Sequence, residues 1–131
     1  MKPSHYRTEL KNVRGLGAAH DGTHHFWVQR VSALALVPLS VWFMIELVTR
    51  LSGSERPELI GWFHHPVNAL LTAILVTLLF WHSRLGVQVI IEDYAHTRSK
   101  KLVLLLLGSG LNLLLCGGAL LAIAHLHFFE V

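Results

Sequence analysis

Residues 67–91 read VNALLTAILVTLLFWHSRLGVQVII, and this stretch decides the fold. At a rise of about 1.5 Å per residue, a helix of this length spans the roughly 30 Å hydrocarbon core of a bilayer. Arg84 is its only residue with a full formal charge. Charges deep in a bilayer cost several kcal/mol each, so near-absence of charge over such a length is typical of a transmembrane helix.

Two further apolar runs flank this one, at about residues 28–49 and 102–124. The first contains Pro38, which we expect to kink a helix, as membranes tolerate. A soluble protein would need amphipathic segments to shield three such runs from water. We see no such segment in the 131 residues, so the runs do not form the core of a soluble protein. The sequence therefore predicts an all-α integral membrane protein with three transmembrane helices. Residues 1–131 form a single domain, with a polar tail at 1–27 and a short loop at 50–66.

The composition agrees with a membrane protein and argues against other classes. Hydrophobic residues make up 53% of the chain and charged residues 15%, whereas soluble domains are about a quarter charged. The net charge is +3, but no basic stretch is interleaved with aromatic residues that could stack on bases. We therefore expect no nucleic-acid partner. Cys116 is the single cysteine, and one thiolate cannot hold an iron–sulfur cluster.

The basic residues predict the orientation. Eight lie in segments that a three-span protein places on one side, against two, Arg50 and Arg56, on the other. The positive-inside rule then puts the N-terminus and residues 92–101 in the cytoplasm. Glu9 and Asp21 argue against a mitochondrial presequence, so we expect the inner membrane of a bacterium, with lipid as a neighbour.

His82 is the main candidate for chemistry, because it lies well inside an apolar run. An ionisable residue at that depth is a functional hypothesis by default, and imidazole is a good ligand for heme iron. A histidine hydrogen-bonded to a neighbouring helix explains the position equally well. Gly86 and Asp93 share its helical face, and the glycine leaves room for a flat macrocycle or for a crossing helix.

The residues at the interface allow two interpretations each. Tyr94 offers a phenolic donor to a quinone carbonyl and Asp93 a proton carrier, although interfacial tyrosines are commonly belt residues. Arg30 can pair with a heme propionate or simply extend to the headgroups. Arg84 points about 160° away from His82, and the sequence leaves its role open.

Two segments resemble the smaller hydrophobic anchor subunit of succinate dehydrogenase. One runs from His82 through Gly86 to Asp93 and Tyr94, and the other from His24 through Arg30 to Ala33, with a hydroxyl residue after the arginine. The resemblance covers about residues 24–101. It implies that His82 is an axial ligand of heme b, that Tyr94 and Asp93 belong to the ubiquinone site, and that Arg30 and His24 lie near the heme propionates.

The resemblance also implies partners. A second three-helix anchor would supply the other axial histidine, and the pair would pack around a shared heme b. A flavoprotein would oxidise succinate, and an iron–sulfur subunit would pass electrons to ubiquinone. The chain would thus belong to an enzyme without binding succinate or being catalytic alone. The alternatives are the anchor of a related fumarate reductase and a structural membrane subunit without cofactor.

Overall fold

The structure, a computed structural model, describes residues 19–53 and 55–129, and every regular element in these ranges is helical. Three long helices carry the fold, and a π-helical turn and a short helix connect the first two. In chain order the elements are α2 (Ala19–Glu46), η1 (Leu47–Leu51), α3 (Arg56–His64), α4 (Pro66–Tyr94) and α5 (Arg98–Phe128). The predicted all-α fold is confirmed, and three helices are long and apolar enough to cross a membrane.

Each long helix extends beyond the apolar run that predicted it. α2 begins at Ala19, inside the expected tail, and continues through Pro38. The expected loop at 50–66 was wrong in part, because α3 lies within it, with a proline in its first turn. A proline is well tolerated there because the first helical N–H groups have no intrahelical partner. Hydropathy marks the part of a helix that lies in hydrocarbon, not where its hydrogen bonding ends.

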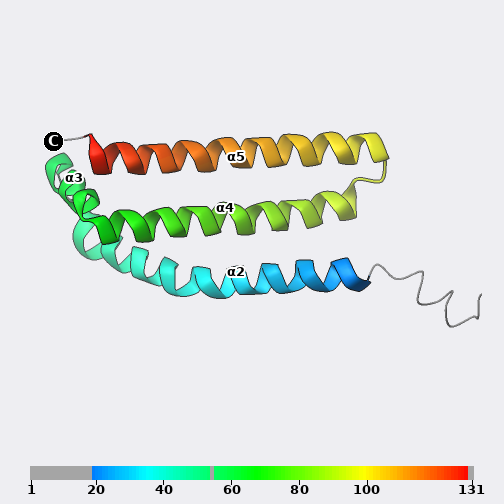
Figure 1. Cartoon of the computed structure of the whole chain (residues 1–131), viewed down its shortest axis with the longest axis horizontal. Helices are drawn as coiled ribbons and strands as arrows, with labels where there is room; N and C mark the ends of the chain where they lie inside the picture. The colour runs from blue at the N-terminus through cyan, green and yellow to red at the C-terminus, as the bar shows by residue number, and fades with distance from the viewer. Residues whose placement is uncertain (1–18, 54, 130–131) are drawn as a thin grey trace, which may run out of the picture.

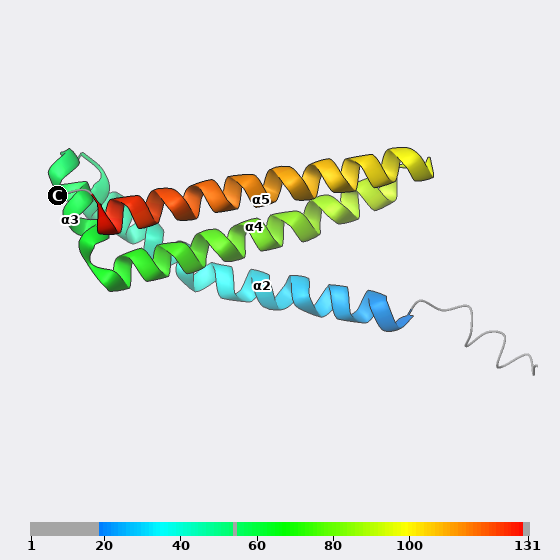
Figure 2. The same ribbon diagram turned by 45° about the horizontal axis from the view of Figure 1, so that its top comes forward.

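The three long helices lie side by side in one layer, with α4 between α2 and α5 (Figures 1 and 2). The turn between α4 and α5 and the described start of α2 lie at one end, which we call the turn end (Figure 1). α3 lies at the opposite end, the α3 end, beside the last turn of α5. Both broad faces of this layer are open to whatever surrounds the chain.

Few side chains are buried within this layer. In the described part of the chain the buried hydrophobic residues are Trp62, Ala69 and Leu75, and the buried polar residues are Ser32 and Thr72. α5 has no buried residue. Apolar side chains therefore face outward along most of every long helix, as lipid or other apolar helices require.

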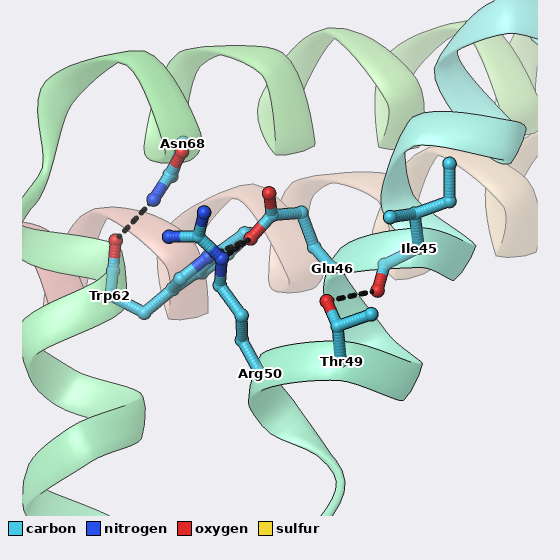
Figure 3. Close-up of polar contacts among 6 residues, drawn as sticks. All are labelled: Ile45, Glu46, Thr49, Arg50, Trp62 and Asn68. Atoms are coloured by element: carbon cyan, nitrogen blue, oxygen red, sulfur yellow. Dashed lines mark hydrogen bonds and ion pairs between the residues drawn. The ribbon is translucent and has the colours of Figure 1, made fainter.

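A polar cluster around Trp62 joins four elements at the α3 end (Figure 3). Trp62 Nε1 donates to Glu46 Oε2 at 2.9 Å, and Arg50 Nε lies 3.3 Å from the same oxygen. The carbonyl of Trp62 accepts a bond from Asn68 Nδ2 at 3.1 Å, and its indole stacks on Trp42. The cluster spans α2, η1, α3 and α4, and it satisfies the buried indole N–H, as a buried donor requires.

α5 is tied to the same end by a histidine. His127 Nδ1 lies 2.8 Å from the carbonyl oxygen of Phe63, in α3. The distance fits donation from the imidazole N–H to the carbonyl. The α3 end is therefore held by specific polar contacts, whereas near the middle of the layer one pair of side chains forms a hydrogen bond between α2 and α4.

Candidate functional site

That pair is Ser32 of α2 and His82 of α4, fifty positions apart in sequence. Ser32 Oγ lies 2.9 Å from His82 Nδ1 and also 2.9 Å from the carbonyl oxygen of Gln29, one turn earlier in α2. Ser32 is only 6% exposed, and His82 is partly buried. The structure therefore brings the predicted heme ligand into contact with a residue to which no role had been assigned.

The chemistry of the two groups determines the direction of these bonds. A serine hydroxyl carries one proton, and a carbonyl can only accept. If Ser32 donates to Gln29, then Ser32 Oγ is left to accept, and His82 must donate through Nδ1–H. Within the described residues no hydrogen bond involves His82 Nε2. In a neutral ring this nitrogen then carries the free lone pair that a metal requires.

Open space lies beside two neighbours of His82, namely Gly86 on the same helix and Ser32 on α2. A Cβ built on Gly86, one turn along α4, would meet nothing within 4 Å, so packing within this chain does not require a glycine there. Ser32 also borders an apolar hollow of about 510 Å³ between α2 and α4, whose walls include Trp27, Val31 and Trp81. The described residues therefore leave open space at Gly86, one turn from His82, and an apolar hollow beside Ser32, although His82 itself does not line that hollow.

The donor set suits a cofactor that brings most of its own ligands. Within residues 19–53 and 55–129, His, Cys, Asp and Glu nowhere gather in a group of three that could hold a metal ion. A bare metal ion would need such a group. In heme the porphyrin supplies four nitrogen ligands, so the protein would need to provide only one or two side chains to hold the iron. His82 is chemically suited to be one of them.

Tyr94 and Asp93 lie at the turn end, away from this pair. Both side chains are exposed, and Tyr94 is the last residue of α4, about 18 Å along the helix from His82. Tyr94 borders an open cavity of about 450 Å³ with His96 and Lys100. A phenol beside an apolar cavity with polar groups at its rim is suitable for binding a quinone headgroup, which has carbonyls to hydrogen-bond and a ring to bury.

The two residues predicted near heme propionates are not brought to His82 within this chain. His24 and Arg30 are both exposed on α2, and the Arg30 guanidinium carbon lies 4.5 Å from the centre of the Phe26 ring. On an ideal helix Arg30 points about 160° away from Ser32, which faces α4. Their assignment to the propionates therefore stays a prediction.

The structure gives the intramembrane arginine a location. Arg84 borders a cleft of about 20 Å³ between α4 and α5, where its neighbours include Gln88, Ser109 and Asn112. Arg84 is exposed, and polar side chains from both helices line the same small cleft. This side of α4 faces α5, and the side with His82 faces α2, so the two ionisable residues belong to different helix contacts.

Comparison with known proteins agrees with this architecture. The model of the succinate dehydrogenase/fumarate reductase transmembrane subunit family matches residues 4–115. The chain belongs to this family. Among relatives of this anchor subunit, the succinate dehydrogenase hydrophobic membrane anchor subunit of Paracoccus denitrificans is 40% identical over 96 residues, 73% of this chain and 74% of the relative. That of Rickettsia bellii is 33% identical over 90 residues, 68% and 70% of the two chains.

The resemblance inferred from the two motifs is thereby confirmed. The relatives are anchors of succinate dehydrogenase, so the chain is a membrane anchor subunit of an oxidoreductase complex and works with other subunits. No solved structure is significantly similar to it.

Sequence reasoning missed Ser32 as a site residue, although the residue lies in the motif from His24 to Ala33. The available signal was a hydroxyl two residues after Arg30, inside an apolar run where a polar group needs a partner. The register between α2 and α4, which brings Ser32 to His82, cannot be derived from either segment alone.

Proposed function

We propose that this anchor subunit binds heme b through His82 in a succinate:ubiquinone oxidoreductase. The observation that carries the proposal is the Ser32–His82 contact in the middle of the helical layer. It supports a ring held in one orientation with Nε2 available, beside the open space at Gly86. When bound, heme b supplies a one-electron redox centre within the membrane.

A second three-helix anchor is part of the proposal. In this proposal His82 would be one ligand of the heme iron, and a histidine of the partner chain would be the other. The layer is one helix thick with two open faces, and a second layer packed on one of them would enclose a cofactor between the two chains. Heme binding and pairing of the anchors are then coupled.

The chemistry of succinate belongs to other subunits. One cysteine and three membrane helices provide neither a flavin site nor an iron–sulfur cluster, so a flavoprotein oxidises succinate and an iron–sulfur subunit carries the electrons. Ubiquinone receives them near Tyr94 and Asp93, where the phenol donates to a quinone carbonyl and the carboxylate relays a proton. The anchor is not catalytic alone.

The proposed location is the bacterial inner membrane, with the turn end in the cytoplasm. The distribution of basic residues supports this orientation. The relatives from Paracoccus and Rickettsia support a bacterial membrane. The turn end carries Tyr94, and it is where soluble partners on the cytoplasmic side would dock. Succinate is oxidised in that compartment, so orientation and electron path agree.

The test is His82→Leu in the complete complex. We expect the reduced-minus-oxidised heme b spectrum to be lost or altered, while succinate oxidation with an artificial acceptor survives. His125→Leu, at the far end of α5, controls for the loss of a histidine. An assembled His82→Leu complex with an unchanged heme spectrum refutes the ligand assignment, and a wild-type complex without a Soret band supports a cofactor-free structural subunit.

A further inference from the structure

We propose that Ser32 is a positioning residue for His82: it accepts the Nδ1 proton and so holds the imidazole in the tautomer whose Nε2 faces a ligand with its lone pair. This rests on the proposed function, in which His82 ligates heme iron. Ser32 does not itself touch the cofactor. It acts through the ring, from a different helix.

The local geometry makes Ser32 well suited to accept. The Gln29 carbonyl, three residues earlier, takes the hydroxyl proton at 2.9 Å and turns the oxygen lone pairs toward α4. His82 Nδ1 lies 2.9 Å from those lone pairs. A hydroxyl that already donates is a stronger acceptor, because chained hydrogen bonds polarise one another. The result is a relay from His82 Nδ1–H to Ser32 and on to Gln29.

The opposite tautomer of His82 satisfies fewer hydrogen bonds with the same groups. With Nδ1 unprotonated, Ser32 would have to donate to it and give up the bond to Gln29, because the hydroxyl has only one proton. The proton would then sit on Nε2 and block a metal. Ser32 is 6% exposed, so water has little access to replace a lost partner. The protonation pattern that satisfies both contacts is the one that frees Nε2.

The contact also couples ring orientation to helix packing. Ser32 and His82 come from α2 and α4, and their hydrogen bond crosses between the two helices. A fixed imidazole needs a fixed partner, and partners of this kind raise the basicity of a ligating histidine. A more basic axial ligand favours ferric over ferrous iron, so the Ser32 contact lowers the midpoint potential of the bound heme.

The experiment compares Ser32→Ala and Ser32→Thr in the complete, purified complex. The alanine removes the acceptor. The threonine keeps the hydroxyl, and its extra methyl has room because Ser32 borders the apolar hollow. Two readouts are measured: the rate of heme loss to excess apomyoglobin, and the midpoint potential of heme b from a redox titration followed optically.

For Ser32→Ala we expect heme loss about 10-fold faster, the lower end of what loss of such a partner costs in affinity, and a higher midpoint potential. Ser32→Thr should stay within about two-fold of the wild type. The matched control is Thr72→Val on α4, because Thr72 is equally buried and bonds only its own helix, at Asn68. It should move neither readout.

The outcomes separate this inference from the function on which it rests. If His82→Leu alters the heme and Ser32→Ala leaves both readouts at wild-type values, the positioning role is refuted and the ligand stands. If His82→Leu leaves the heme unchanged, the ligand assignment fails, and the role of Ser32 fails with it. An effect of Thr72→Val equal to that of Ser32→Ala would show general loosening of the helix layer, and it would also overturn the proposal.

Discussion

The indole of Trp62 donates a hydrogen bond of 2.9 Å to Glu46, which also pairs with Arg50 at 3.3 Å (Figure 3). Trp62 is the only described aromatic residue classed as buried. It comes from α3, whereas Glu46 ends α2 where the chain widens into the π-helical turn η1. A short helix absent from the predicted topology thus locks the first connection of the fold.

Trp62→Phe should destabilise the anchor by about 1–2 kcal/mol, because it leaves Glu46 without a buried donor while keeping most of the ring contacts. Unfolding in mixed detergent, followed by tryptophan fluorescence or circular dichroism, measures the change. Trp81→Phe is the control, since Trp81 is exposed and makes no hydrogen bond to a described residue. Equal effects of the two variants would mean that ring size, not the bond to Glu46, sets the stability.

Gly86→Leu should weaken heme retention several-fold without weakening the helix. A Cβ at Gly86 meets nothing within 4 Å in this chain, and leucine is the better helix former by about 0.8 kcal/mol. Any cost of the added Cβ therefore arises from something outside the described residues. Gly110→Leu, at an equally open position on α5, is the matched control. Heme content per flavin is the measurement, and identical values for both variants would leave Gly86 with no part in the site.

Tyr94→Phe removes the phenolic hydroxyl and keeps the ring beside the cavity of about 450 Å³. We expect ubiquinone reduction to fall several-fold, on the order of 1 kcal/mol for one neutral hydrogen bond. Succinate oxidation with an artificial acceptor provides the internal control and should not change. Unchanged quinone kinetics would identify Tyr94 as an ordinary interfacial tyrosine.

Orientation can be tested with two cysteines placed in a Cys116→Ser background. Ser99 lies in the first turn of α5 at the turn end, and Ser52 follows η1 at the α3 end; both are exposed. We expect a membrane-impermeant maleimide added to intact cells to label Ser52→Cys and to label Ser99→Cys only after the membrane is opened. The reverse pattern would invert the proposed topology, and the positive-inside argument with it.

The sequence predicted the membrane helices well, because hydropathy over some 20 residues is a strong local signal. It did not predict α3, whose nine residues are too short and too polar for that signal. It singled out His82 as a candidate ligand but not the contact of His82 with Ser32, because a contact across fifty positions depends on how α2 is rotated against α4. Such rotation is set by packing summed over both helices. A histidine can therefore be recognised from its depth, but its partner cannot.

The single layer of three helices affects how long an unassembled chain survives in the cell. Only five side chains are buried in the described part of the chain, so burial within the chain contributes little to its stability. A newly made copy therefore lies in the bilayer with broad apolar helix faces that no partner chain covers. We expect orphan copies to have short half-lives, measurable by pulse–chase when the other subunits are deleted. Cellular abundance would then follow the supply of partners and heme more closely than the rate of its own synthesis.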